Sequence, residues 1–261
     1  MERKKLKFIG CDVMYREACA MAARSPHRVD LRFLPKSMHD DTDEMRRRIQ
    51  DAVDTVDPEV GYHGILLGYG RCNDGVVGVH ARRIPLVIPR AHDCITLFFG
   101  SREAFKKSFE DQPGTYYMTT GWYERAVGGA PLEDQSSVQH LPGASGYDEL
   151  VRRYGRDNAD YIAETLGSWS KNYSRMLYLE MGATDEQPII EAARAEAESR
   201  GWSFERRKGD RTLMEKFFGG DWDEDFVVIP PGGHIVACND DRILDVELTV
   251  ADEAGGSGGG A

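Results

Sequence analysis

The apolar and polar residues of this chain alternate between two periodicities. Short apolar runs typical of buried strands are followed by segments in which apolar residues recur at helical spacing, as at Ile189, Ile190, Ala193 and Ala197. Strands that alternate with helices of this length are typical of βαβ units with right-handed crossovers. The pattern therefore predicts an α/β fold with parallel sheets.

Two stretches of the chain share one order of elements: strand, helix, strand, helix, strand. Asp43 and Asp185 stand at the starts of their long helices, where Asp is a favoured capping residue. We interpret the two stretches as similar lobes. The expected elements are 5–9, 14–23, 29–34, 42–56 and 64–68 in the first stretch, and 175–180, 186–200, 203–207, 211–218 and 225–229 in the second.

A shorter unit lies between these stretches. It comprises strand 85–88, helix 102–110 and strand 115–119, and Ser101 is placed to cap its helix. The sequence predicts two lobes and a middle unit around a central crevice. The expected boundaries are 1–82 for the N-terminal lobe, 83–146 for the middle unit with a Gly-, Pro- and Ser-rich loop, 147–252 for the C-terminal lobe with a helix at 147–171, and 253–261 for a flexible glycine-rich tail.

The charge and hydropathy of the chain argue against two classes of partner, nucleic acids and membranes. The formal net charge is −11, which argues against a nucleic-acid partner because phosphate binding requires a basic face. No apolar run approaches the roughly 18 residues that a membrane-spanning helix needs. The amino-terminal residues lack the apolar core of a secretory signal. We therefore expect a cytoplasmic protein with neither a nucleic-acid nor a membrane partner.

The cysteines carry the clearest functional signal. The chain has five, and in a reducing compartment free or metal-bound thiols are expected more than a disulfide framework. Cys11, Cys72 and Cys94 each follow a strand-like run. Because ligands bind at the carboxyl ends of parallel strands, we expect these three thiols to converge in the crevice. Cys19, inside a predicted helix, is interpreted as a small buried hydrophobe.

Such a cysteine set is typical of a metal site. His92 and Cys94 are separated by one residue, so an extended backbone would point both side chains the same way. Cys11, Cys72, Cys94 and His92 would form a closed zinc site, whereas the three cysteines without His92 would leave one position open, as in catalytic sites. Three cysteines also suit a 4Fe–4S cluster with one iron free for substrate. The sequence does not distinguish between a zinc ion and an iron–sulfur cluster.

Polar residues beside the cysteines are candidates for catalysis. The planar guanidinium of Arg90 would hold a substrate carboxylate or phosphate. Asp93 would orient His92, the second catalytic candidate. Cys238 and His234, near a later strand, are further possible ligands that the spacing does not decide.

The segment 68–75 predicts a polar turn at the end of a strand. Its main-chain N–H groups would bind an anion or hold a thiolate, and we assign Gly70 and Asn73 as candidate cofactor-contacting residues. The alternative is a simple turn whose glycines supply positive φ. Trp122, at the carboxyl end of strand 115–119, is a third candidate contact, and packing in the core is an equally good interpretation of its indole.

These segments together resemble the domain-of-unknown-function 1638 (DUF1638) family of bacteria and archaea. The resemblance covers roughly residues 5–240 and is carried by Cys11, the loop 68–75, residues 85–97 and residues 114–122. It implies an α/β fold and association with corrinoid-dependent methyl-transfer systems, and it assigns no catalytic roles. Arg71 stands where we expect a small or apolar residue, which leaves the ligand of this loop open.

Our leading hypothesis is a metal-dependent enzyme that acts on a small molecule in corrinoid-linked one-carbon metabolism. A zinc–thiolate site would activate a substrate thiol for methyl transfer, and the His-x-Cys pair is similar to the zinc motif of cobalamin-dependent thiol methyltransferases. An iron–sulfur centre would instead support lyase-like chemistry. The alternative is a non-catalytic accessory protein that carries a metal or corrinoid to a partner. A third possibility is that the cysteines are structural.

Overall fold

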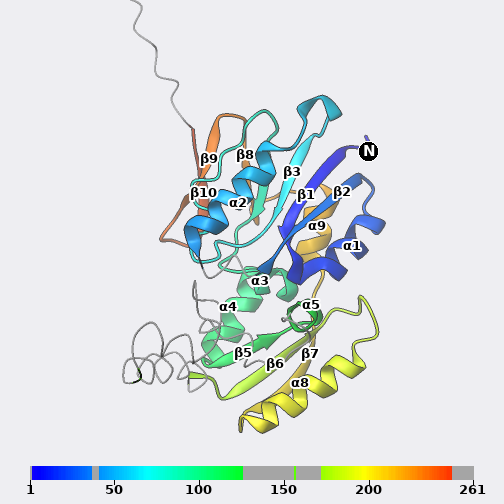
Figure 1. Cartoon of the computed structure of the whole chain (residues 1–261), viewed down its shortest axis with the longest axis vertical. Coiled ribbons are helices and arrows are strands. Elements are labelled where there is room, and N and C mark those ends of the chain that lie inside the picture. Colours follow the sequence, from blue (N-terminus) through cyan, green and yellow to red (C-terminus); the bar gives the residue numbers. More distant parts are fainter. Residues whose placement is uncertain (1, 37–40, 126–155, 157–171, 249–261) are drawn as a thin grey trace, which may run out of the picture.

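The structure of this chain, a computed structural model, describes residues 2–36, 41–125, 156 and 172–248. It contains a larger sheet, drawn in the upper part of Figure 1, and a smaller sheet, drawn below it. The expected loop at 128–146, the tail at 253–261 and all but one residue of the expected helix at 147–171 lie outside the described residues.

The larger sheet has five strands in the order β2-β1-β3-β4-β8. The first four are parallel, and β8 runs antiparallel to β4. Every residue of β3 and β4 is buried, as expected for central strands covered on both faces. The strands span β1 (Lys5–Cys11), β2 (Arg28–Leu34), β3 (Gly64–Gly68), β4 (Leu86–Pro89) and β8 (Phe226–Ile229).

Helices pack on this sheet through apolar stripes. The helix α2 begins after Asp41, whose carboxylate accepts hydrogen bonds from the N–H groups of Asp43 and Glu44, so the cap lies two residues before the expected one. Ring contacts from Phe8 on β1 to Phe217 and Phe218 hold α9 against the sheet. The elements are α1 (Tyr15–Arg24), α2 (Thr42–Asp54), α3 (Ile95–Phe99) and α9 (Thr212–Gly219), with short 3-10 turns η1 (Asp12–Met14) and η3 (Pro58–Val60).

The smaller sheet has three parallel strands in the order β5-β6-β7. The hydroxyl of Ser101 accepts a hydrogen bond from the N–H of Ala104 at 3.1 Å, which confirms the expected cap of α4. A separate antiparallel hairpin, β9–β10, is attached through a bridge between His80 and His234. The bounds are β5 (Thr115–Met118), β6 (Arg175–Glu180), β7 (Ser203–Lys208), β9 (Gly233–Ala237), β10 (Leu244–Leu248), α4 (Arg102–Asp111), α5 (Thr120–Glu124) and α8 (Gln187–Ser199).

The pairing of the strands differs from the expected pair of similar lobes. β5, expected in the middle unit, pairs with β6, and β8, expected to close the C-terminal lobe, pairs antiparallel with β4 in the larger sheet. The sheets therefore do not follow the expected boundaries at 1–82, 83–146 and 147–252. An apolar run predicts a buried strand but not its partner, and an antiparallel edge strand fits readily on a parallel sheet. The mixed α/β fold with a parallel-rich sheet is confirmed.

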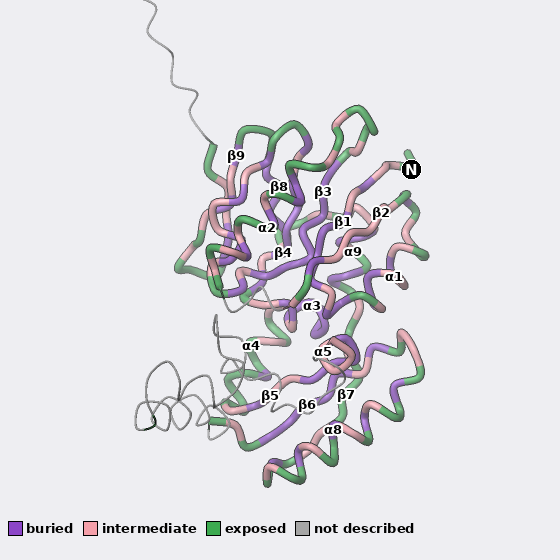
Figure 2. The backbone as a smooth tube through the Cα atoms, in the orientation of Figure 1, coloured by how far each residue is buried: buried purple, intermediate pink, exposed green. Residues whose placement is uncertain are grey.

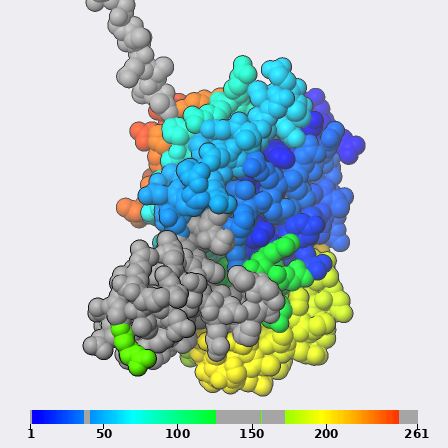
Figure 3. Space-filling view, viewed as in Figure 1, coloured from blue at the N-terminus to red at the C-terminus, as the bar shows by residue number. Residues whose placement is uncertain are grey.

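The two sheets meet where η1 contacts α5. Buried residues run along β1, β3 and β4 and continue into α3 toward this junction (Figure 2). The contact is close, because a Cβ atom on Gly121 would lie 1.6 Å from the carbonyl oxygen of Val13. In the space-filling view the green α5 lies directly against the blue N-terminal segment (Figure 3). No helix among the described residues is long and apolar enough to cross a bilayer.

Candidate functional site

The larger sheet reverses its strand order between β1 and β3. The chain passes from β1 to β2 on one side, and β3 lies on the other side of β1. In doubly wound sheets, ligands bind outside the carboxyl ends of the strands at this point. Cys11 is the last residue of β1, and Cys72 follows β3 by four residues. Two of the three candidate thiols therefore lie at the switch point.

The loop that follows β3 and the loop that follows β4 are bonded to each other by their main chains. The N–H of Arg71 donates to the carbonyl of Ala91 at 2.7 Å, and the N–H of Cys72 donates to the carbonyl of His92 at 2.9 Å. Gly70 permits this approach, because a Cβ atom there would lie 2.6 Å from the Cα of Asp93. Gly70, a candidate cofactor contact, is thus required for bringing the two loops together.

Three consecutive residues of the first loop have a left-handed backbone. Cys72, Asn73 and Asp74 have φ angles of 46°, 59° and 67°, which non-glycine residues adopt rarely and at an energetic cost. The Arg71 guanidinium pairs with the Asp74 carboxylate and restrains the turn. The interpretation in which glycines supply positive φ here is wrong. Gly68, Gly70 and Gly75 instead allow close packing, Gly68 against Phe8 and Gly75 against Met45.

The structure brings the three thiols together in a buried environment. Cys11, Cys72 and Cys94 are 1, 7 and 7% exposed. Burial raises the pKa of the Cys11 thiol to about 12. Burial also raises the pKa values of Cys72 and Cys94; the charges of Asp93 and Cys11 add to the effect at Cys72, and those of Cys72 and Cys11 at Cys94. Each thiol of this cluster therefore lies within the electrostatic influence of another, and ionising one opposes ionising the next.

Main-chain N–H groups point at the sulfur atoms. Hydrogen bonds from the N–H of Val13 and Asp12 lower the pKa of Cys11 against the effect of burial. The N–H groups of Gly70 and Cys94 act in the same way on Cys72. Such N–H···S bonds support thiolate ligands in metal and cluster sites, where they tune the properties of the centre.

A tyrosine that the sequence analysis did not select lies among the thiols. Tyr69 is 0% exposed, and its hydroxyl has no hydrogen-bond partner among the described residues. Burial raises its pKa, and the charges of Cys11, Cys72 and Cys94 raise it further. The Tyr69 hydroxyl therefore lacks an acceptor, and leaving a buried hydroxyl unpaired costs about 1–3 kcal/mol. The signal in the sequence was its position between two glycines at the end of a buried strand.

The three thiols are not arranged around a common centre. Within the described part of the chain, no three His, Cys, Asp or Glu side chains form a ready metal-binding group. The chemistry of the donors nevertheless suits a soft or borderline metal, since three thiols, N–H donors and an unpaired hydroxyl lie together. Rotation about the Cα–Cβ bond of a cysteine redirects its sulfur without moving the backbone.

Comparison with known proteins identifies the family. The DUF1638 family, described as proteins of unknown function, matches residues 33–218 of the chain. The chain belongs to the DUF1638 family. The matched segment includes Cys72 and Cys94 but not Cys11, and it is shorter than the span over which we noted a resemblance. No curated protein and no solved structure matched.

In this DUF1638 protein His92 and Cys94 do not point the same way. His92 is exposed, whereas Cys94 is buried. The backbone bends here, because Cys94 has φ −66° and ψ −19° and stands at the start of α3, so the expected extended geometry is wrong. The carbonyl of His92 accepts the hydrogen bond of Cys72, and the carboxylate of Asp93 accepts one from the N–H of Ile95 at 3.0 Å.

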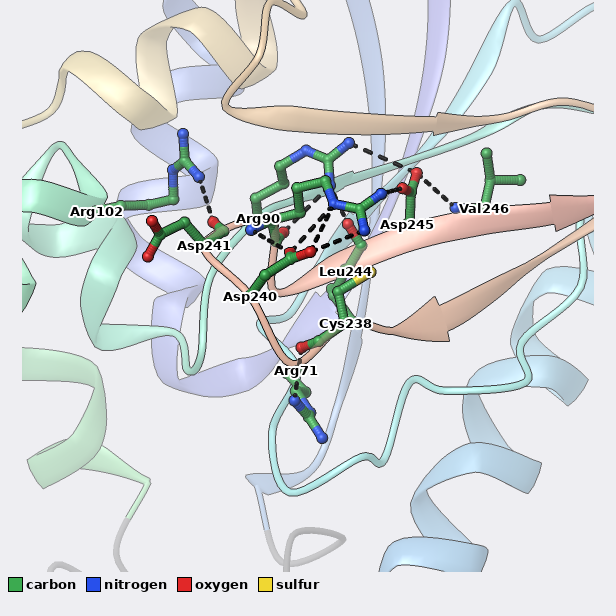
Figure 4. A network of polar contacts seen from close by, with 10 residues as sticks. Arg71, Arg90, Arg102, Cys238, Asp240, Asp241, Leu244, Asp245 and Val246 are labelled. Carbon is green, nitrogen blue, oxygen red and sulfur yellow. Dashed lines mark hydrogen bonds and ion pairs between the residues drawn. The ribbon is translucent and has the colours of Figure 1, made fainter.

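Arg90 contacts the end of the loop between β9 and β10 and the first residues of β10 (Figure 4). Its Nη1 donates to the carbonyls of Leu244 and, at 3.1 Å, Arg242, and its Nη2 lies 3.7 Å from the carboxylate of Asp245. The guanidinium that we expected to hold a substrate thus holds part of the protein itself. A guanidinium offers several further N–H donors, so its proposed role toward substrate stays a prediction.

Cys238 begins the loop between β9 and β10, residues 238–243. The carbonyl of Cys238 accepts a hydrogen bond from Nη1 of Arg71 at 3.2 Å, and its half-buried side chain influences the pKa values of Arg71 and Arg242 (Figure 4). His234 instead faces His80, with ring centres 5.0 Å apart. Neither residue is among the largest influences on the pKa values of the three thiols.

The two remaining candidate cofactor contacts are Trp122 and Asn73. Trp122 lies between the two hydrophobic cores, donates from Nε1 to the hydroxyl of Tyr116 at 2.8 Å, and carries the ammonium of Lys36 4.5 Å from its ring centre. Lys36 also lowers the pKa of Cys11, which places the indole on the Cys11 side of the cluster. Asn73 is exposed, and its carbonyl accepts a hydrogen bond from Thr42.

Proposed function

We propose that Cys11, Cys72 and Cys94 hold a zinc ion or an iron–sulfur cluster at the switch point, and that the loaded centre acts on a small molecule. The observation that carries this proposal is the convergence of three buried thiols that oppose one another's ionisation although N–H groups point at them. A bound cation would remove this conflict, because coordination deprotonates a thiol.

The residues of the chain supply the rest of the site. A metal held by three protein ligands keeps an open position and supplies Lewis-acid activation to what binds there. The unpaired hydroxyl of Tyr69 would donate a hydrogen bond to an anionic or thiolate ligand at that position. The N–H groups of Gly70 and Cys94 would stabilise the thiolate of Cys72, and the main-chain bonds between the loops would keep Cys72 beside Cys94.

The test of the metal centre is anaerobic purification followed by elemental analysis and a visible spectrum. We expect either stoichiometric zinc in colourless protein or stoichiometric iron and sulfide with broad visible absorption. Cys11→Ser, Cys72→Ser and Cys94→Ser should each lose most of the metal. Cys19→Ser and Cys238→Ser, outside the cluster, are the matched controls and should retain it. Wild-type protein that takes up no stoichiometric metal in reconstitution contradicts the proposal.

Methyl transfer is the specific reaction we propose for a zinc centre, and lyase-like chemistry for a cluster. The corrinoid link rests on the family resemblance. Loaded protein should be assayed with a methylated corrinoid and a thiol acceptor, and, for the cluster, for release of water or sulfide from small hydroxy and thiol acids. Turnover that disappears in Cys72→Ser and persists in Cys19→Ser supports the enzyme.

A non-catalytic accessory role is the second candidate. The near-complete burial of all three cysteines favours it, because a catalytic thiolate centre must admit a substrate, whereas a metal that is only held needs no access for substrate. Tight metal binding without turnover, together with a stable complex with a corrinoid protein in size-exclusion chromatography, would support this role over the enzyme.

A further inference from the structure

A cavity of about 150 Å³ lies between α1 and the carboxyl end of β6, away from the three thiols. It is lined by one face of α1, by the residues that follow β6, and by the start of α9. Its polar side chains are one carboxylate and two guanidinium groups, and the rest of the wall is apolar or glycine. The lining residues are Glu17, Ala20, Met21, Arg24, Met181, Gly182, Ala183, Arg211 and Met214.

The carboxylate of Glu17 is buried without a partner from another described residue. Glu17 is 2% exposed, and within the described part of the chain neither of its oxygen atoms has a hydrogen-bond partner on another residue. The neighbouring buried carboxylate of Glu186 is satisfied, because it accepts hydrogen bonds from the hydroxyl of Tyr178 at 3.0 Å and from the N–H of Gly182. Burying a carboxylate without donors is costly, so the site lacks a donor that the described protein atoms do not supply.

The charged groups around Glu17 explain its protonation. Burial, aided by the charges of Glu186 and Glu124, raises the pKa of Glu17 to about 7, although its own main-chain N–H and Arg16 lower it. Arg16 pairs with Glu124 at 2.6 Å, which limits its effect on Glu17. A donor that carries positive charge, or an O–H group, would stabilise the Glu17 carboxylate in this position.

Two guanidinium groups also line the cavity, that of Arg24 at the end of α1 and that of Arg211 at the start of α9. Arg24 is exposed, and Arg211 donates from Nε and Nη2 to the carbonyl of Met181, which leaves further N–H donors of its five. Gly182 allows this approach, because a Cβ atom there would lie 2.9 Å from Nη2 of Arg211. Methionine side chains, which adapt to small apolar groups, form much of the remaining wall.

A larger, open cavity of about 590 Å³ adjoins the first one. Met181, Gly182 and Arg211 line both cavities, and the ends of β6 and β7 and the first turn of α9 complete the outer one. A ligand that enters at the carboxyl ends of these parallel strands, where ligands of α/β proteins bind, would meet Arg211 before Glu17.

We propose that this cavity binds a small 2-hydroxy or 2-amino carboxylate, with Glu17 accepting a hydrogen bond from the hydroxyl or ammonium group and Arg211 facing the carboxylate. The inner volume equals that of about five water molecules in the liquid, which limits the side chain of the ligand to a short aliphatic group. The site contains no cysteine, so its test does not depend on whether the three thiols bind a metal.

Calorimetric titration with four probes tests the site. L-alanine and L-lactate carry both groups, propionate lacks the donor, and isopropylamine lacks the carboxylate. We expect at least one of the first two to bind at least tenfold more tightly than both single-group probes. Failure of both to bind, or equal binding of propionate, overturns the proposal.

Variants assign the role of Glu17. Glu17→Gln should weaken the binding of the preferred probe at least tenfold, and Glu191→Gln, on the exposed face of α8, should leave it unchanged. Unchanged affinity in Glu17→Gln also overturns the proposal. If that variant does not fold, as judged by circular dichroism, the comparison of alanine and lactate with propionate decides. For alanine, affinity should rise between pH 6 and pH 8 as Glu17 loses its proton, because the carboxylate pairs with the ammonium.

Discussion

Single side chains in this protein are held in conditions that raise their energy, and Glu17 is the clearest case. Its folded-state pKa of about 7 lies above the ordinary value of 4.5, so the folded protein binds this proton more tightly than the unfolded chain does. The carboxyl therefore costs nothing below pH 4.5, and its cost grows as pH rises to 7, to about 3 kcal/mol.

Glu17→Gln should remove this pH dependence. The free energy of unfolding of the variant, relative to wild type, should rise by about 3 kcal/mol between pH 4 and pH 8. Urea denaturation at both pH values measures this change, with Glu191→Gln as the control. A difference between variant and wild type that stays constant with pH would show that Glu17 titrates normally.

Gly70 is the second residue whose identity follows from its contacts. Gly70→Ala should force the loops after β3 and β4 apart, because the added Cβ meets the main chain of Asp93, which cannot rotate away. We expect a loss of about 1–3 kcal/mol in stability and a loss of bound metal. Gly219→Ala, where the added Cβ meets only a carboxylate at 3.5 Å, is the matched control for both measurements.

The sequence was informative about some of these residues and silent about others. It placed Cys11, Cys72 and Cys94 after strands, and the parallel order of β1, β3 and β4 then brings them to one edge. Tyr69 and Glu17 were missed because an unpaired buried group is a property of tertiary contacts. The left-handed backbone at Cys72 was missed because such angles are normally predicted only at glycine, asparagine or aspartate.

Helices and strands that are long enough to show a periodic pattern of apolar residues were predicted well. β3 and β6 begin and end where the apolar runs do, and α2 begins at its expected residue. The helices α3 and α5 were missed because five residues are too few to show a helical period. The pairing of β8 with β4 was missed because local pattern reports burial and not the neighbouring strand.

The β9–β10 loop gives a prediction at this scale. Arg90→Leu should expose its carbonyl partners and destabilise the loop by about 1–3 kcal/mol. Hydrogen exchange should speed up in residues 238–245, while Arg83→Leu, at an exposed position before β4, should leave it unchanged. Unchanged exchange in Arg90→Leu, combined with lost substrate binding, would instead favour the role that the sequence predicted for Arg90.

For the whole molecule, metal binding should be coupled to stability. A ligand that binds only the folded state adds about 2.7 kcal/mol when its free concentration is a hundred times its dissociation constant. We therefore expect chelator-treated protein to unfold several degrees below the loaded protein in a thermal scan. The unfolding temperature of Cys94→Ser should change neither on metal loading nor on chelator treatment. Equal unfolding temperatures of loaded and stripped wild type would show that the thiols bind no metal in the folded state.

The contact of Gly121 with the carbonyl of Val13 has a mechanical consequence. Cys11 is two residues from that contact, whereas Cys72 and Cys94 stand on loops that are bonded to each other. The smaller sheet also reaches α3, which begins directly after Cys94, because the N–H of Asp210 after β7 donates to the carbonyl of Phe98 at 2.9 Å. A shift of the smaller sheet would therefore act on the supports of both Cys11 and Cys94, so a metal held by these thiols should also hold the two sheets together.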